Sequence, residues 1–107
     1  MNTLDNTAEN VLQWAKDRDI LEHSNTMTQA IKTLEEVQEL LNAIDLKDEE
    51  EVIDAYGDIF VTLVIGSHIN GGSLAEYAEN AYNVIKNRKG RLLPNGSFLK
   101  EQILKDM

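Results

Sequence analysis

Cysteine is absent from this chain of 107 residues. Its absence excludes disulfide bonds and zinc sites built on cysteine thiolates. Apolar residues make up 42% of the chain, which is enough for a folded protein with a hydrophobic core. At this length we expect one globular domain, residues 1–107, and not two.

Positive charge is scarce. The chain has 10 lysine and arginine residues against 19 aspartate and glutamate residues, which gives a net charge of −9. Because such a surface repels the phosphate backbone of nucleic acids, we predict no binding to DNA or RNA. Most of the acidic side chains are expected to be solvated and to aid solubility. The informative acids are those at helical positions that point inward.

Long hydrophobic runs and a secretory signal are also missing. Residues 1–9 contain neither the basic segment nor the apolar segment that a signal peptide combines. The longest apolar stretch is short and is flanked by acidic residues, so no membrane span is predicted. We therefore expect a cytoplasmic protein that does not associate with membranes.

Strand signals are absent, and the spacing of apolar residues by three and four predicts an all-α bundle of four to five helices. Residues 23–25 are expected to form a loop, and Asn95 with Gly96 a turn. The helices are predicted over residues 6–19, 26–44, 49–69 and 74–89, with a short one from residue 98.

Capping patterns mark where these helices should begin and end. A capping box is a Ser, Thr or Asp followed three residues later by Glu or Gln. Gly71 and Gly72 are expected to end the third helix, and Gly90 to follow the last turn of the fourth. The three predicted boxes are Thr26 with Gln29, Asp48 with Glu51, and Ser73 with Glu76.

The third predicted helix bears on the assembly. Residues 59–65 are apolar almost all round, so the other helices or a second subunit must enclose this helix. Four helices of one short chain cover a central helix poorly. We therefore predict a homodimer or a homotetramer.

Two clusters of carboxylates lie on consecutive predicted helices, over residues 35–39 and 54–58. Residues three or four apart share a helix face, so Glu36 neighbours Glu39, and Asp54 neighbours Asp58. Two carboxylates about 4 Å apart repel by roughly 4 kcal/mol at an effective dielectric constant near 20. If both clusters meet, Mg²⁺ or Mn²⁺, which prefer oxygen ligands, would neutralise them.

Each cluster also has an ordinary explanation, because glutamate-rich patterns are common on solvated helices. Gly57 favours the functional explanation. Glycine inside a helix costs about 1 kcal/mol relative to alanine, so its presence beside Asp58 indicates close packing or space for a ligand.

In this order and spacing, the motifs resemble the MazG-like all-α nucleoside triphosphate pyrophosphohydrolases, and most closely a short, phage-type branch. The pattern of that family is EExxE followed on the next helix by ExxD. The first half is intact at residues 35–39. Further similar segments are residues 13–20, Gln29 with Lys32, residues 81–91 and residues 95–100.

The second half of the pattern departs from the family. The glutamate of ExxD would fall on Ala55, which cannot bind a metal. Asp54, four residues before Asp58, is the plausible substitute. A shift of one residue rotates a side chain by about 100° around the helix, so the fourth metal ligand and the number of metals stay open.

The resemblance implies cleavage of a nucleoside triphosphate between its α- and β-phosphates, giving a monophosphate and pyrophosphate. It implies Mg²⁺ as the cofactor, with Mn²⁺ as an alternative, and a role in clearing unwanted nucleotides. Glu35 would act as the catalytic residue that orients or deprotonates water, or else is an ordinary solvated glutamate. The expected metal ligands are Glu36, Glu39, Asp54 and Asp58.

Six further residues are candidates for substrate binding. The basic residues near position 88 could meet the pyrophosphate, or could simply interact favourably with a helix C-terminus. The tryptophan could stack on a base, although a tryptophan in an apolar helical stripe is more often part of the core. The candidates are Trp14, Gln29, Lys32, Asn83, Lys86 and Arg88.

Two other functions fit the same residues. An acidic helical oligomer could mimic DNA or sequester a basic partner without any catalysis. Alternatively, Ala55 could mark a relic of the fold that binds metal or nucleotide and no longer turns it over.

Overall fold

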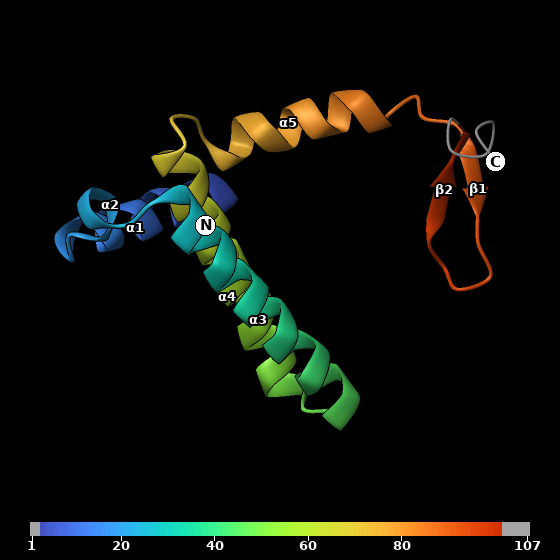
Figure 1. Ribbon diagram of the computed structural model, residues 1–107, viewed down its shortest axis with the longest axis horizontal. Helices are drawn as coiled ribbons and strands as arrows, with labels where there is room; N and C mark the ends of the chain where they lie inside the picture. The colour runs from blue at the N-terminus through green and yellow to red at the C-terminus, as the bar shows by residue number, and fades with distance from the viewer. Residues whose placement is uncertain (1–2, 102–107) are drawn as a thin grey trace. The chain divides into compact units, whose positions relative to one another are not determined.

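The computed structural model describes residues 3–101 and is mainly helical, as the sequence predicts (Figure 1). The chain divides into two compact units, residues 1–77 and 78–107. Its elements are α1 (Leu4–Asp17), α2 (Ile20–His23), α3 (Thr26–Leu46), α4 (Glu49–Ile69), α5 (Leu74–Ile85), β1 (Gly90–Leu92) and β2 (Phe98–Lys100).

The first predicted helix, residues 6–19, corresponds to α1, and the single turn α2 follows it; His23, predicted to lie in a loop, is the last residue of α2. Thr3 caps α1, because its Oγ1 accepts a hydrogen bond from the backbone N–H of Asn6 at 3.1 Å. The helix therefore begins before the predicted residue 6. Asp19 separates α1 from α2 with a φ of +62°, a left-handed conformation that aspartate tolerates better than most residues.

The two 21-residue helices α3 and α4 lie side by side as an antiparallel pair (Figure 1). Asp48 caps α4 by accepting from the Glu51 N–H at 3.3 Å, and α4 has the predicted bounds. The cap of α3 is different from the prediction. Asn25, not Thr26, accepts the N–H of Thr28 at 2.7 Å. Asparagine is the better cap of the two, which explains the shift by one residue.

The buried centre of the first unit is made of small and medium side chains. They are Ala15, Ala43, Ala55, Val64 and Ile65. Within residues 59–65, only the last two of these are buried, so the first unit by itself does not enclose this segment.

Many large apolar side chains of α3 and α4 are exposed instead. They include Met27, Ile31, Leu34 and Leu41 on α3, and Ile53, Tyr56 and Leu63 on α4.

Helix α4 is long and apolar enough to cross a membrane, judged by length and composition alone. The core helix of a soluble protein meets the same criterion. The expected cytoplasmic location therefore stays a prediction.

The α5 helix begins as predicted and ends early. Ser73 Oγ accepts the N–H of Glu76 and donates to its carboxylate, both at 3.1 Å, so this capping box is confirmed. The last helical residue is Ile85, not 89, and Gly90 begins a strand rather than following a helix.

The second unit contains a β-hairpin that was not predicted, and the helix expected from residue 98 is wrong for Phe98–Lys100. Strands β1 and β2 pair antiparallel, with Arg91 opposite Leu99. A Cβ on Gly90 would overlap the Leu99 carbonyl oxygen and the Phe98 ring, so glycine lets the strands approach. Three-residue strands are too short to show the alternation from which a strand is recognised.

The turn at Asn95 and Gly96 is confirmed. Gly96 has a φ of +90° and donates its N–H to the Leu93 carbonyl at 2.9 Å. The Asn95 side chain accepts from the N–H of Ser97 at 3.1 Å. A glycine with positive φ in a short loop is typical of β-hairpins.

Candidate active site

The structure brings four of the predicted site residues together. Glu36 and Glu39 lie on α3, Asp54 and Asp58 lie on α4, and these four side chains affect one another electrostatically. We call them the carboxylate cluster. Glu36 and Asp58 are half-buried, whereas Glu39 and Asp54 are exposed. The carboxylate cluster thus extends from the surface of the helix pair toward its interior.

Burial and the mutual repulsion of the carboxylates raise the pKa of two members of the cluster. Burial raises the pKa of Glu36 to about 7, and a hydrogen bond and charge repulsion from Glu39, then the charges of Asp58 and Asp54, act in the same direction. Burial also raises the pKa of Asp58, followed by the charge and hydrogen bond of Asp54 and the charge of Glu39. Each proton that these carboxylates retain reduces their mutual repulsion.

One oxygen of the cluster has no partner. Glu36 Oε2 is buried and makes no hydrogen bond. A buried acceptor without a donor is unfavourable, and no basic side chain contributes to the electrostatics of Glu36 or Asp58. An orphaned oxygen among four carboxylates has the donor chemistry that Mg²⁺ or Mn²⁺ takes. The residues therefore fit a hard divalent cation.

The side chains do not yet form a ligand set. Across residues 3–101, no three His, Cys, Asp or Glu side chains are arranged so that they could hold one metal ion. The carboxylates converge on one region of the helix pair, and their ends would have to rotate to share an ion.

Asp54 and Ala55 occupy different surroundings. Asp54 acts on both Glu36 and Asp58, so it belongs to the cluster. Ala55 is 3% exposed and is part of the packed centre of the unit. The carboxylate of α4 that joins Asp58 is therefore at position 54, one residue before the position in the family pattern.

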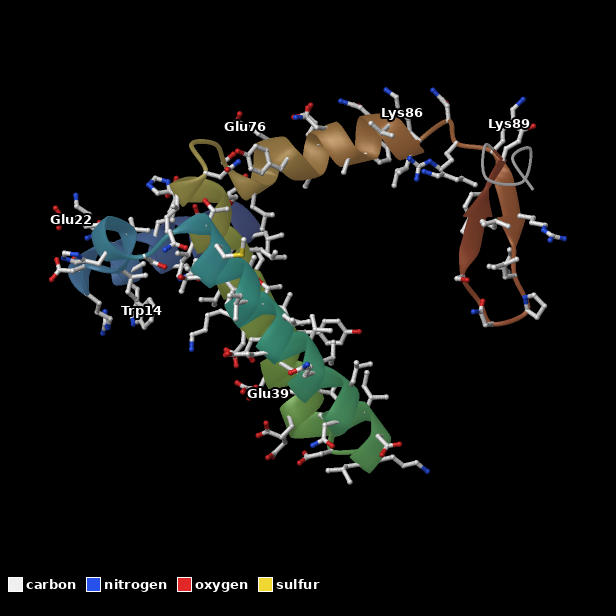
Figure 2. The ribbon with its side chains drawn as sticks, in the orientation of Figure 1. Trp14, Glu22, Glu39, Glu76, Lys86 and Lys89 are labelled. Carbon is white, nitrogen blue, oxygen red and sulfur yellow. The ribbon has the colours of Figure 1, made fainter. Side chains whose placement is uncertain are left out.

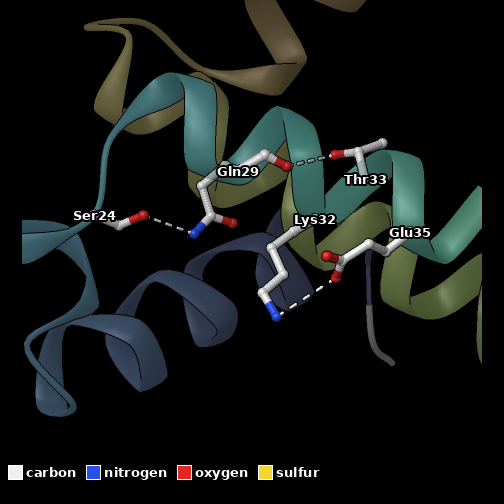
Figure 3. A network of polar contacts seen from close by, with 5 residues as sticks. All are labelled: Ser24, Gln29, Lys32, Thr33 and Glu35. Carbon is white, nitrogen blue, oxygen red and sulfur yellow. Dashed lines mark hydrogen bonds and ion pairs between the residues drawn. The ribbon is translucent and has the colours of Figure 1, made fainter.

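Glu35 lies beside the cluster and not within it. Its carboxylate pairs with Lys32 Nζ at 3.7 Å, and both side chains are more than half exposed (Figure 3). Glu35 is not among the causes of the raised pKa of Glu36 or Asp58. Two predicted residues, the catalytic Glu35 and the substrate-binding Lys32, thus form one exposed ion pair.

Gln29 is 8% exposed and holds the start of α3 in place (Figure 3). Its Nε2 donates to Ser24 Oγ at 3.0 Å, and a Cβ on Gly66 would lie 3.3 Å from its own Cβ. It also lines a cavity of about 310 Å³ that none of the four clustered carboxylates borders. Its contacts are those of a structural residue, and its substrate role stays a prediction.

Trp14 is 44% exposed, so it is not a core residue. The Arg18 guanidinium lies 4.6 Å from the ring centroid, within range of a cation–π interaction. Figure 2 shows the Trp14 side chain projecting from α1. The same figure labels Glu39 on α3.

Three substrate candidates belong to the second unit. Asn83 lies on α5, and its Oδ1 accepts from Lys86 Nζ at 3.4 Å. Lys86, labelled in Figure 2, and Arg88 follow the last helical residue, Ile85, and both are exposed. Both explanations for these cations, phosphate binding and a favourable interaction with the helix C-terminus, remain open.

Sequence reasoning missed one contact near the cluster. Thr33 on α3 and Thr62 on α4 hydrogen-bond through their hydroxyl oxygens, which are 2.8 Å apart. A signal for it existed, because Thr62 is the only polar residue between positions 59 and 65.

The chain is similar to a phage protein. It is 37% identical over 65 residues to the "uncharacterized 18.2 kDa protein in rep-hol intergenic region" of Haemophilus phage HP1 (strain HP1c1). The matched segment covers 61% of this chain and 40% of the phage protein, so the chain spans less than half the length of that relative. No protein family and no solved structure matches the chain.

Proposed function

We propose that the protein is a Mg²⁺-dependent nucleoside triphosphate pyrophosphohydrolase of the MazG-like type, with Mn²⁺ as an alternative ion. The observation that carries the proposal is the convergence of Glu36, Glu39, Asp54 and Asp58 from two helices around a buried oxygen without a partner. An arrangement of like charges is costly unless a cation binds there.

The four carboxylates would hold the ion, which when bound supplies charge neutralisation for the triphosphate and activates the attacking water. Glu35 is suited to orient that water and to accept its proton. Its carboxylate is exposed, lies on the same helix as Glu36 and Glu39, and is held by Lys32. The water oxygen would bond to phosphorus as the bond between the α- and β-phosphates breaks, and pyrophosphate would leave.

A homodimer or homotetramer is part of the proposal. A stripe of exposed apolar side chains runs along α3 at Met27, Ile31, Leu34 and Leu41, a spacing that puts them on one helix face. Exposed apolar surface of this extent favours association. A cytoplasmic role in clearing unwanted nucleotides fits a water-exposed acidic site, and it rests on the resemblance.

The test is to incubate the protein with each nucleoside triphosphate and Mg²⁺, and to separate the products by ion-exchange chromatography. Equal amounts of monophosphate and pyrophosphate are expected, and EDTA should abolish the reaction. Release of orthophosphate as the only phosphate product would contradict the pyrophosphohydrolase activity.

A pair of variants makes this test specific to the cluster. Glu39→Gln removes one charge from the cluster and should lower kcat/KM by roughly 100-fold, because several kcal/mol of charge stabilisation are lost. Glu50→Gln removes the same charge from the exposed start of α4 and should leave kcat/KM unchanged. Equal activity of the two variants would mean that the site lies elsewhere.

A metal-binding relic is the second candidate, and one observation favours it. The four carboxylates converge without forming a ligand set. The relic would bind Mg²⁺, measured by calorimetry, and would give no turnover with any triphosphate. Turnover above the EDTA control excludes it.

A further inference from the structure

A pair of threonine hydroxyls joins α3 to α4 next to the carboxylate cluster. Thr33 Oγ1 lies 2.8 Å from Thr62 Oγ1, and both residues are half-buried. Within residues 3–101, it is the one side-chain hydrogen bond that connects these two helices. We call this contact the threonine bridge.

The two hydroxyls of the threonine bridge share two protons among three contacts. Thr33 Oγ1 also lies 2.9 Å from the Gln29 carbonyl oxygen, and Thr62 Oγ1 lies 2.8 Å from the Ile59 carbonyl oxygen. Each hydroxyl has one proton to donate, so the two cannot serve all three contacts at once. A hydrogen bond across the helix pair therefore requires one threonine to donate to the other hydroxyl in place of its own-helix carbonyl. Bonds of a threonine to its own helix are common and contribute little, so the distinctive effect of the pair is the link between helices.

The threonine bridge lies one helical turn from the acids. Thr33 precedes Glu36 by three residues on α3, and Thr62 follows Asp58 by four residues on α4. Residues at these spacings are neighbours on a helix surface. The bridge therefore links the two helices beside the point where Glu36 and Asp58 come together.

The register of the two helices matters for the ion. The carboxylates repel one another and favour separation or sliding of α3 and α4. A slide by one residue moves a side chain about 1.5 Å along the helix axis. Mg²⁺ demands near-ideal octahedral geometry at about 2.0–2.1 Å, whereas Ca²⁺ accepts irregular coordination at about 2.3–2.6 Å. A loss of register should therefore affect Mg²⁺ more than Ca²⁺.

We propose that Thr33 and Thr62 are positioning residues whose hydroxyl bridge fixes the register of α3 against α4, so that the carboxylates of the two helices need only rotate their ends to share one Mg²⁺ ion. This inference rests on the proposed function, because it assumes that the cluster binds the ion. If the bridge only satisfied two polar groups in the helix interface, its loss would change stability and leave the preference between ions unchanged.

Valine substitutions separate these roles. The double variant Thr33→Val/Thr62→Val removes both hydroxyls at similar volume and leaves neither partner unpaired, so its Tm in EDTA should stay near that of the wild type. Dissociation constants for Mg²⁺ and Ca²⁺ are measured by isothermal titration calorimetry. We expect the Mg²⁺ constant to rise about fivefold, the effect of one hydrogen bond, and the Ca²⁺ constant to change less than twofold.

Two controls accompany the double variant. Thr33→Ser/Thr62→Ser keeps both hydroxyls and should restore the wild-type Mg²⁺ constant. Thr28→Val removes an exposed hydroxyl from the same helix and should change neither constant. If the valine pair does not fold, Thr33→Ala, which leaves more room, provides the same comparison of ions.

The outcomes are distinct. A wild-type protein that binds Mg²⁺, together with a double variant that binds it equally well, overturns the positioning role and leaves the proposed function standing. Equal weakening of Mg²⁺ and Ca²⁺ binding also overturns it. If the wild type binds neither ion, the proposed function itself fails, and this inference fails with it.

Discussion

Glu36 shows, at the scale of a single residue, what the carboxylate cluster does to the metal-free protein. Its raised pKa, about 7, has burial as its largest cause and three neighbouring carboxylates as the others. Near neutral pH the ionised form is therefore disfavoured in the folded state relative to the unfolded chain. Either a proton or a cation relieves this, so pH and metal should act on the same residue.

Protonation of Glu36 makes the stability of the metal-free protein depend on pH. The folded pKa of Glu36 lies above its ordinary value of 4.5, so the folded state holds the proton more tightly. The resulting stabilisation is complete below about pH 4.5 and is lost as the pH rises through about 7. In EDTA, Glu36→Gln should therefore be more stable than the wild type at pH 8, and the difference should shrink toward pH 5.

Thermal unfolding of both proteins at each pH measures this difference. Glu50→Gln, exposed at the start of α4, is the matched control and should show no such trend. A gap between wild type and Glu36→Gln that is constant with pH would contradict the assigned environment of Glu36.

Position 55 allows a second prediction for a single residue. Because Ala55 is buried, Ala55→Glu would force a longer, charged side chain into the packed centre and should destabilise the fold by about 3 kcal/mol or more. Asp54→Asn should leave the unfolding free energy close to that of the wild type and weaken Mg²⁺ binding. Urea unfolding and calorimetry measure the two effects. Tighter Mg²⁺ binding by a folded Ala55→Glu protein would contradict them.

At the scale of elements, the ends of the helices show where local sequence rules hold. The Asp48 and Ser73 caps follow the predicted boxes, because capping involves only residues three apart. At α3 the cap is Asn25, and Gln29 bonds to Ser24 instead of closing a box. Two adjacent cap-forming residues left a choice that the pattern alone did not decide.

The cap of α3 can be tested directly. Asn25→Ala removes the acceptor for the Thr28 N–H and should reduce the free energy of unfolding by about 1 kcal/mol. Thr26→Ala changes the neighbouring residue that the sequence favoured. It should reduce the free energy of unfolding by only a few tenths of the loss expected for Asn25→Ala. Urea unfolding of both variants decides which residue caps the helix. A larger loss from Thr26→Ala would contradict the structure.

At the scale of the whole molecule, the apolar side chains that periodicity assigns to a core are largely exposed within the first unit. Ile31 and Leu34 on α3, and Ile53 and Tyr56 on α4, are all at least half exposed. Periodicity identifies which face of a helix is apolar, and it does not identify what covers that face.

Association of copies through this surface is therefore a prediction for the whole molecule. Ile31→Glu should shift the protein toward monomers, because burying an unpaired charge in an interface is costly. Light scattering coupled to size-exclusion chromatography measures the mass. Leu4→Glu, at a more exposed apolar residue of α1, should leave the mass unchanged. A monomeric wild type would contradict the prediction.

The mainly helical character, the bounds of α4, two of the caps and the two acidic clusters on consecutive helices could all be predicted from the sequence. These features depend on residues within one or two turns of each other. The tertiary structure adds that the clusters converge, that Ala55 is buried beside Asp54, and that Thr33 meets Thr62. Those features depend on how two helices are rotated and shifted against each other, which non-local packing sets.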